Sequence, residues 1–236
     1  RDWSSDVCSS DLNITEGLDG LRPRLAEYFL MGARFAKWRA LIKIGEGRPS
    51  DYAIRTNMHA LGRYAALCQE QRLVPIVEPE VLMDGTHSID DCRSATDRSL
   101  SAVFEELDVQ NVDLAGIVLK PNMVLSGSGA SDRAPAEEVA RQTVDCFLEH
   151  VPASVPGIAF LSGGQGNEES VVNLDAINKI ANREDLPWEL TYSYGRGLQA
   201  APLAAWKGEV ANVAAAQAVF QQRGRDSSVA REGVYS

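Results

Sequence analysis

The 236-residue sequence is short of the features that mark several common classes of protein. Basic residues are outnumbered by acidic ones, 23 against 33, and the resulting net charge of −10 disfavours nucleic acid or an anionic membrane as the main partner. No apolar run approaches the roughly 20 residues that a membrane-spanning helix needs. No G-x-G-x-x-G follows a predicted strand, which weakens a dinucleotide-binding interpretation. The sequence therefore predicts neither a nucleic-acid-binding protein nor a membrane protein.

Cysteine and histidine are also scarce. The four cysteines show no C-x-x-C spacing, which argues against a disulfide framework and indicates a reducing, cytoplasmic setting. The three histidines, His59, His87 and His150, have no spacing typical of metal ligands. The sequence therefore predicts no metal site and no bound cofactor.

The composition is that of an ordinary globular protein, with 44% hydrophobic and 24% charged residues, and the length suits a single α/β domain. Residues 1–12, RDWSSDVCSSDL, lack helix or strand periodicity and resemble translated sequencing adapter. We expect them to be a non-native artefact, the alternative being a disordered N-terminus. We expect the folded domain to cover residues 13–223, followed by a flexible polar tail over residues 224–236.

Strand-like apolar segments alternate with helical patterns from residue 13 onward. Ser50 and Ser88 stand where they can cap two of the helices. Strand–helix alternation with nearly continuous apolar strands predicts a parallel sheet covered by helices. The strand-like segments are FAKWRALIKIG (35–45), VPIVEPE (74–80), GIVLKPN (116–122), GIAFLSGGQG (157–166) and ELTYSYGR (189–196).

Two α/β architectures are compatible with this pattern. A five-stranded doubly wound sheet would be complete as it stands, whereas a (β/α)8 TIM barrel of roughly 250 residues would be incomplete, with about strands 4 to 8 present. Period two places Lys37 with Arg39, and Glu78 with Glu80, on one face of their strands. Polar side chains that share a face near strand ends suit a barrel mouth, because an open sheet would bury them beneath its helices. The sequence therefore favours the barrel.

Lys120 carries the strongest chemical signal, because it is an amine at the end of an apolar strand. An amine attacks a carbonyl only when it is neutral, so its reference pKa of about 10.4 must fall through desolvation or neighbouring cations. Lys37 and Arg39 can supply that positive charge, while Glu78 and Glu80 can transfer protons. The other interpretation is a Lys–Glu ion-pair network that only holds the strand ends together.

Two motifs in the last two strand-like segments suit a phosphate. SGGQG follows the fourth strand, where glycine N–H groups and a helix N-terminus can approach an anion. SYGR follows the fifth strand, where an arginine fork suits the same ligand. The structural alternatives are a tight turn that needs positive φ in the first case and a surface arginine in the second. The candidate phosphate ligands are Ser162, Gly163, Gly164, Ser193, Gly195 and Arg196.

Taken together, these strings resemble class I fructose-bisphosphate aldolase. The matching strings follow that family's order and approximate spacing: TEGLDGL, FAKWR, KIGEG, VPIVEPE, LKPNM, FLSGGQ, NLDAIN and SYGR. The resemblance implies a cytoplasmic (β/α)8 barrel that cleaves fructose 1,6-bisphosphate reversibly into dihydroxyacetone phosphate and glyceraldehyde 3-phosphate without a metal. It also implies a phosphorylated sugar as the substrate and a homotetrameric parent protein.

The resemblance assigns roles to the candidate residues. It makes Lys120 the lysine that forms the Schiff base and Glu78 the acid and base of imine formation. Glu80 and Lys37 would tune the lysine and its proton transfers, and Arg39 would line the pocket. The six candidate phosphate ligands named above would hold a substrate phosphate.

The resemblance is weak at the end of the chain and incomplete at its start. The match of Tyr235 to the family's C-terminal tyrosine, which exchanges a proton with the enamine, rests on a short and variable tail. The family's first three strands, which carry an aspartate, a lysine and basic residues for a second phosphate, have no counterpart in residues 1–12. We therefore expect this chain to be an inactive and poorly soluble fragment of an active aldolase.

Two other functions stay open. Another Schiff-base barrel, such as a transaldolase or a deoxyribose-phosphate aldolase, would use the same lysine chemistry, but the matching strings do not favour it. A noncatalytic barrel scaffold is expected to have lost Lys120 or the two glutamates, and all three are present.

Overall fold

Five parallel strands form one sheet in the structure, a computed structural model that describes residues 13–236. The strands lie side by side in chain order, and helix α1 (Leu21–Leu30) precedes the first of them. The expectations about residues 1–12 lie outside the described part of the chain. The strands are β1 (Phe35–Ile42), β2 (Val74–Val81), β3 (Val118–Leu119), β4 (Gly157–Phe160) and β5 (Glu189–Tyr192).

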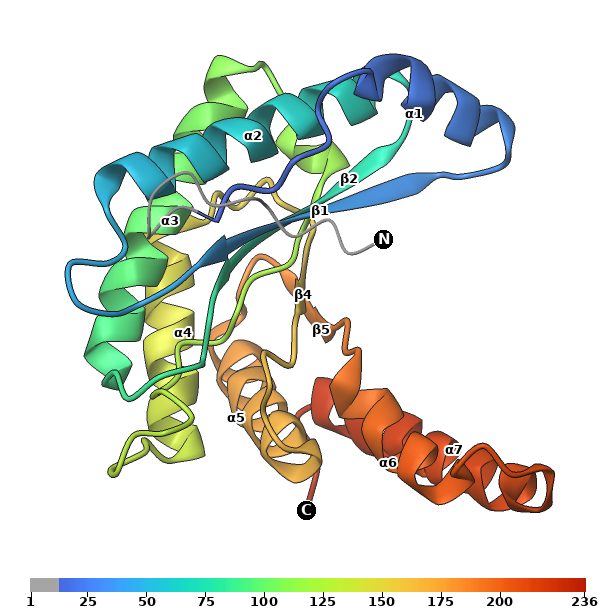
Figure 1. The fold of residues 1–236 in the computed structure, drawn as a ribbon. Coiled ribbons are helices and arrows are strands. Elements are labelled where there is room, and N and C mark those ends of the chain that lie inside the picture. Colours follow the sequence, from blue (N-terminus) through green and yellow to red (C-terminus); the bar gives the residue numbers. More distant parts are fainter. Residues whose placement is uncertain (1–12) are drawn as a thin grey trace.

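A helix follows each of the first four strands and covers the convex face of the sheet (Figure 1). A doubly wound sheet reverses its strand order and has helices on both faces, whereas a β/α barrel keeps chain order with helices outside. The barrel prediction is therefore confirmed over this arc, and the doubly wound alternative is wrong. The helices are α2 (Asp51–Glu70), α3 (Ile89–Val109), α4 (Ala136–His150) and α5 (Asn167–Glu184).

Both serine caps predicted from the sequence are confirmed. Ser50 accepts a hydrogen bond from the N–H of Ala53 at the start of α2. Ser88 accepts the N–H of Asp91, and the Asp91 carboxylate accepts the N–H of Ser88 in return, which is a capping box. These caps fix where α2 and α3 begin after their strands.

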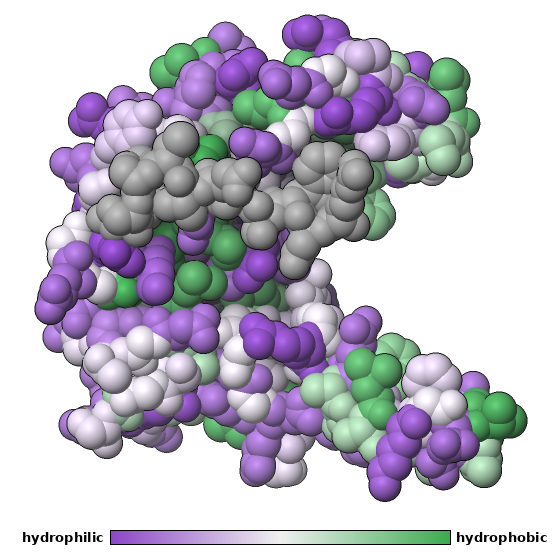
Figure 2. Space-filling view, in the orientation of Figure 1, coloured by the Kyte–Doolittle hydropathy of each residue, from purple (hydrophilic) through white to green (hydrophobic). Residues whose placement is uncertain are grey.

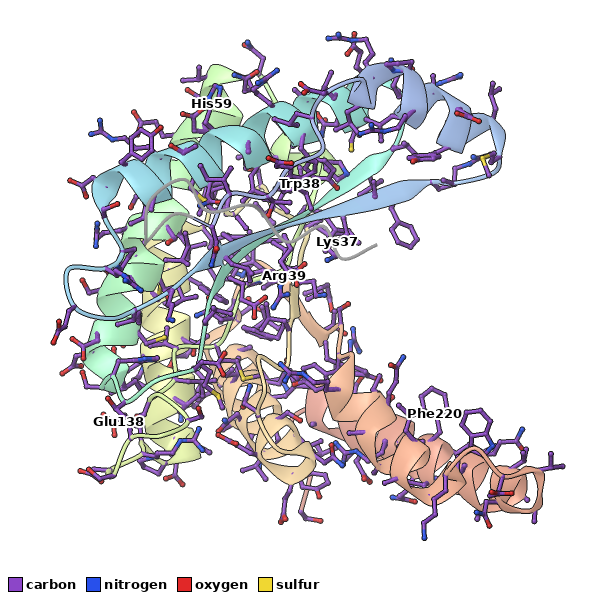
Figure 3. All side chains as sticks on the ribbon, in the orientation of Figure 1. Lys37, Trp38, Arg39, His59, Glu138 and Phe220 are labelled. Carbon is purple, nitrogen blue, oxygen red and sulfur yellow. The ribbon has the colours of Figure 1, made fainter. Side chains whose placement is uncertain are left out.

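Alternation along β1 separates the core from the candidate site. Trp38 is buried on the helix-covered side, where its ring centroid lies 5.5 Å from that of Tyr64 on α2. Lys37 and Arg39 point to the concave side of the sheet (Figure 3). The apolar core therefore lies between strands and helices, and the charged side chains reach the other face.

The third strand is shorter than the sequence predicted. Regular pairing covers Val118–Leu119, and Pro121, which has no N–H, cannot extend it. The N–H of Lys120 still donates to the carbonyl of Val77 at 2.8 Å. Lys120 is therefore anchored beside β2 at the point where β3 ends.

The C-terminal region is a helical hairpin, not a helix and a flexible tail. Helix α6 (Arg196–Trp206) and helix α7 (Val213–Arg231) are joined through a 3-10 turn, η2 (Val210–Asn212), and extend away from the sheet (Figure 1). Residues 224–231, which the sequence assigned to the tail, belong to α7 in the structure. Helix α7 continues there because three spaced side chains on one face are buried: Arg223, Ser227 and Ala230.

The described part of the molecule is an arc that is open on one side, between β1 and β5 (Figure 2). The α6–α7 hairpin presents apolar side chains to solvent, among them Leu203, Trp206 and Phe220.

Another short 3-10 turn, η1 (Leu114–Gly116), precedes β3. Within residues 13–236, no helix combines the length and apolar character needed to cross a membrane.

Candidate active site

The register of the sheet places three charged residues in one row across β1, β2 and the end of β3. In the backbone register of the strands, Arg39 lies opposite Glu78. Lys120 directly follows Leu119, the β3 residue that lies opposite Val77. Lys37 lies two residues earlier on β1, on the same concave face. Parallel pairing thus gathers side chains that the sequence placed on separate strands, as the barrel interpretation predicted.

The Glu78 carboxylate lies between two lysines. Its Oε1 is 3.1 Å from Nζ of Lys120, and its Oε2 is 3.0 Å from Nζ of Lys37. Glu78 is 3% exposed and the Lys120 side chain 14% exposed, whereas Lys37 is more open to solvent. A buried carboxylate is costly without a counter-charge, so the two ammonium groups stabilise it where it stands.

The second glutamate of the motif has a separate partner. Nη2 of Arg39 lies 3.0 Å from Oε1 of Glu80, and Nε of the same guanidinium contacts the other carboxylate oxygen. This bidentate hydrogen bond raises the pKa of Arg39 above its usual value, with burial acting in the opposite direction. Because Arg39 is paired with Glu80, Lys37 is the cation that shares a carboxylate with Lys120.

This arrangement suits proton transfer at an amine. The Glu78 oxygen lies 3.1 Å from Nζ of Lys120, within the reach required of a general base. Lys37 forms an ion pair with the other carboxylate oxygen, which favours an orientation of the group toward the concave side. A carbonyl compound that enters this side would meet the nucleophile and the acid together.

The turn between β4 and α5 passes beside Arg196. Gly163 and Gly164 have φ of 58° and 93°, in the left-handed region that favours glycine, so the tight-turn interpretation is confirmed. A Cβ added to Gly164 would lie 3.5 Å from Nη2 of Arg196. The neighbouring Ser162 is 5% exposed. The two motifs that the sequence suggested for a phosphate therefore meet in one corner.

The arginine in this corner has no protein counter-charge. Arg196 is the first residue of α6, and among residues 13–236 its exposed side chain makes no ion pair or hydrogen bond. Ser193 is held by its N–H, which donates to the carbonyl of Phe160 at 2.8 Å, and Gly195 is the N-cap of α6. The first turn of α6 carries no acidic residue, whereas that of α5 carries two glutamates. An anion is therefore better placed at the N-terminus of α6 than at the N-terminus of α5.

The backbone of Tyr235 is bonded to α5. Its N–H donates to Oδ1 of Asp175 at 2.8 Å, and its carbonyl accepts from Nζ of Lys179 at 3.5 Å. Both partners belong to α5, and the tyrosine side chain packs against the core. These contacts do not support a role for Tyr235 at the reacting carbon atoms.

Sequence reasoning missed two buried polar residues near the site. Asn122 accepts the N–H of Val81 at 2.9 Å and donates to Oγ1 of Thr96 at 3.1 Å, which ties the ends of β2 and β3 to α3. Arg223 on α7 contacts the starts of α5 and α6. The LKPN string offered a signal for Asn122, a polar residue directly after a strand-ending proline. No local pattern offered one for Arg223.

The described residues contain one group of three side chains with the spacing of metal ligands: Asp97, Glu149 and His150. The guanidinium of Arg93 already lies against it, 2.6 Å from Asp97 and 2.7 Å from Glu149. The group lies on the outer helices α3 and α4 rather than with Lys120. We assign it to the surface ion pairs between these helices.

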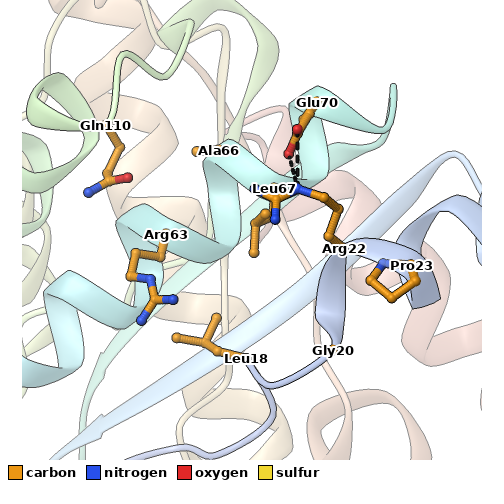
Figure 4. A pocket seen from close by; sticks show the side chains of 9 residues that line it. All are labelled: Leu18, Gly20, Arg22, Pro23, Arg63, Ala66, Leu67, Glu70 and Gln110. Atoms are coloured by element: carbon orange, nitrogen blue, oxygen red, sulfur yellow. Dashed lines mark hydrogen bonds and ion pairs between the residues drawn. The ribbon is translucent and has the colours of Figure 1, made fainter.

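A cleft of about 400 Å³ lies between α1 and α2 (Figure 4). Arg22 and Glu70 form an ion pair at 2.9 Å across its rim. Neither Lys120 nor the two glutamates of β2 line this cleft, so it is separate from the candidate site.

Comparisons with known proteins agree on one family. A family profile described as class-I fructose-bisphosphate aldolase matches residues 4–236. A Xanthomonas campestris protein named "Probable fructose-bisphosphate aldolase class 1" is 52% identical over 93% of this chain and 65% of its own length. The cytosolic fructose-bisphosphate aldolase 4 of Arabidopsis thaliana is 49% identical over 94% of this chain and 56% of its own length.

A solved structure gives the same result. Fructose-bisphosphate aldolase from Plasmodium falciparum matches with a TM-score of 0.94 and 45% identity, over 99% of this chain and 67% of that chain. The chain thus spans 65% or less of the length of the two sequence relatives named above.

Proposed function

Since the chain belongs to the class I fructose-bisphosphate aldolase family, we propose that it carries the imine-forming part of an active site for fructose 1,6-bisphosphate. The reaction is reversible cleavage to dihydroxyacetone phosphate and glyceraldehyde 3-phosphate. The observation that carries the proposal is the Glu78 carboxylate, 3.1 Å from Lys120 and 3.0 Å from Lys37 on the concave side of the sheet.

Imine formation uses Lys120 and Glu78. Lys120 first passes its ammonium proton to Glu78. The neutral amine then attacks the ketone carbon C2 of the sugar, and Glu78 gives that proton to the new alkoxide to form a carbinolamine. Glu78 accepts the proton that the nitrogen loses and returns a proton to the hydroxyl, which leaves as water. Lys37, bound to the other oxygen of Glu78, keeps the carboxylate oriented through both transfers.

Cleavage follows from the iminium. The C4 hydroxyl loses its proton, C4 becomes the aldehyde carbon, and the C3–C4 electron pair moves toward the iminium to give an enamine. A proton then returns to C3, and water hydrolyses the iminium to release dihydroxyacetone phosphate and free Lys120. Arg39 lies two residues after Lys37 on β1, and Glu80 lies two residues after Glu78 on β2. Their hydrogen-bonded side chains border the sugar.

The phosphate on the dihydroxyacetone side is assigned to the corner between β4 and β5. Arg196 supplies the charge, and the backbone of Gly163 and Gly164 supplies N–H donors. Ser162, Ser193 and Gly195 complete the corner, which follows the last two strands of the arc.

Borohydride trapping tests the proposal. After incubation with dihydroxyacetone phosphate and sodium borohydride, we expect a reduced secondary-amine adduct on the peptide that contains Lys120, detected by mass spectrometry. Lys120→Arg should abolish the adduct. Lys207→Arg, in the exposed turn after α6, is the matched control and should be labelled like the wild type. A folded protein that is unlabelled, or labelled at another lysine, would overturn the assignment.

We also propose a cytoplasmic location, a phosphorylated sugar as the small-molecule partner and a homotetramer for the whole protein. These follow from the family membership, and two plant relatives are named as cytosolic or cytoplasmic forms. Static light scattering of the purified protein tests the oligomeric state, where a mass other than that of four chains would contradict the tetramer.

A further inference from the structure

We propose that Arg223 is a positioning residue for the phosphate corner, acting through the backbone of the two loops that form it. This inference rests on the proposed function, because it concerns the affinity of the same site for a phosphorylated ligand. Arg223 belongs to α7, the second of the two helices that follow β5 in the chain.

The guanidinium of Arg223 joins the starts of two helices. Its Nη2 donates to the carbonyl of Asn167, the first residue of α5, at 2.6 Å, and its Nε donates to the carbonyl of Gly197 in α6 at 3.2 Å. Arg223 is 9% exposed, and its nearest carboxylate, Asp226, lies at the longer distance of 3.5 Å. Its strongest contacts are therefore with main-chain carbonyls of α5 and α6.

These two carbonyls lie beside the phosphate corner. Gly197 directly follows Arg196, and a Cβ added to Gly197 would lie 3.3 Å from Cβ of Ser162. On the other side of the corner, Gly164 approaches the guanidinium of Arg196. The glycine turn and the start of α6 thus approach each other closely at two points, and Arg223 is bonded to the first turns of both helices.

The planar fork of an arginine explains why this residue type occupies the position. Two donors in fixed directions define the separation of two acceptors on different helices, which a flexible ammonium cannot do as well. If that separation changes, the glycine N–H groups and the Arg196 side chain no longer converge on one phosphate, and positioning errors of about 1 Å weaken a site strongly. The predicted effect is on ligand affinity more than on the reaction of Lys120 with a bound ketone.

The experiment compares three variants in the borohydride assay. Arg223→Met should raise the half-saturating concentration of dihydroxyacetone phosphate about tenfold, in line with the loss of charge-assisted hydrogen bonds, while the trapping rate at saturation changes little. Arg223→Lys keeps the charge but loses the fork, and it should also raise that concentration, though less. Arg225→Met removes the same charge from an exposed position on the same helix and should behave like the wild type.

Competition by inorganic phosphate supplies a second measurement. The phosphate concentration that halves trapping at a fixed fraction of saturation should rise for Arg223→Met and not for Arg225→Met. A purely structural role would lower the amount of trappable protein. It would change neither the half-saturating concentration of dihydroxyacetone phosphate nor the phosphate concentration that halves trapping. That outcome would overturn the inference, as would Arg223→Lys behaving like the wild type.

The two proposals fail in different ways. If the wild-type protein forms no adduct at Lys120, the proposed function is wrong. If the wild type forms the adduct with saturable dependence on dihydroxyacetone phosphate, and Arg223→Met shows the same dependence, only the positioning role is wrong.

Discussion

Glu78 is the residue on which the candidate chemistry depends most closely. One carboxylate oxygen faces Lys120 and the other faces Lys37, so a single buried side chain connects the nucleophile to a second cation. Its loss would leave two ammonium groups near each other without their shared counter-charge, and a buried charge that has lost its partner is strongly unfavourable.

Glu78→Gln is therefore expected to slow trapping of dihydroxyacetone phosphate about 100-fold, because the amide cannot accept the proton from the attacking amine. Glu138→Gln makes the same chemical change on the exposed surface of α4, far from β2 (Figure 3), and should leave the rate unchanged. Quenched-flow borohydride trapping measures both rates. Equal rates for the two variants would remove Glu78 from the mechanism and leave it as a structural ion-pair partner.

Among the elements, α7 shows most clearly how a helix can be held by tertiary contacts. Its buried face consists of Arg223, Ser227 and Ala230, which is not an apolar stripe. Arg223 bonds to carbonyls of α5 and α6, and Tyr192 on β5 shares a hydrogen bond with Ser228 at 3.2 Å. Helices in proteins are stabilised mainly by packing, and here much of that packing is polar.

Ala230→Asp should lower the free energy of unfolding by about 3 kcal/mol, because Ala230 is fully buried and the new carboxylate would have no partner there. Ala218→Asp, at an exposed position of the same helix, should change stability by less than ~0.5 kcal/mol. Urea denaturation followed by circular dichroism gives both values. If both variants were neutral, residues 224–236 would behave as the flexible tail that the sequence suggested.

The whole described molecule is an arc with an open concave side. Lys120 and the phosphate corner lie on that side. The α6–α7 hairpin, which follows the corner in the sequence, exposes apolar side chains that include Leu203, Trp206 and Phe220. Exposed apolar patches of this kind favour self-association. Water that reaches the concave side weakens each electrostatic interaction within it.

The 236-residue chain is therefore expected to form the reduced imine at Lys120 yet to cleave fructose 1,6-bisphosphate at least about 100-fold more slowly than the Xanthomonas campestris relative. The relative serves as the control, assayed under the same conditions by coupling triose formation to nicotinamide oxidation. Cleavage within tenfold of that control would contradict both this prediction and the inactivity expected from the sequence.

Much of the fold and of the candidate site was open to prediction, because it depends on local pattern. Strand–helix alternation gave the order of elements, and period two put Lys37 and Arg39 on the concave face, where the structure has them. Strand ends in a parallel sheet share one edge, so Glu78 and Lys120 could be expected to meet. The length of β3 could not be predicted, because it depends on where β2 and β4 pair with it, and regular pairing reaches only Val118 and Leu119.

The sequence by itself determined the alternation of strands and helices, the serine caps and the residue types at the strand ends, since each of these is encoded within a few neighbouring positions. Only the tertiary structure decided that the side chains of Arg39 and Glu80 pair, that Tyr235 bonds to Asp175 of α5, and that Arg223 joins α5 to α6. These contacts link residues 26 to 60 positions apart in the chain. No local periodicity specifies them, because their partners are fixed only when packed helices and paired strands bring distant backbone and charge together.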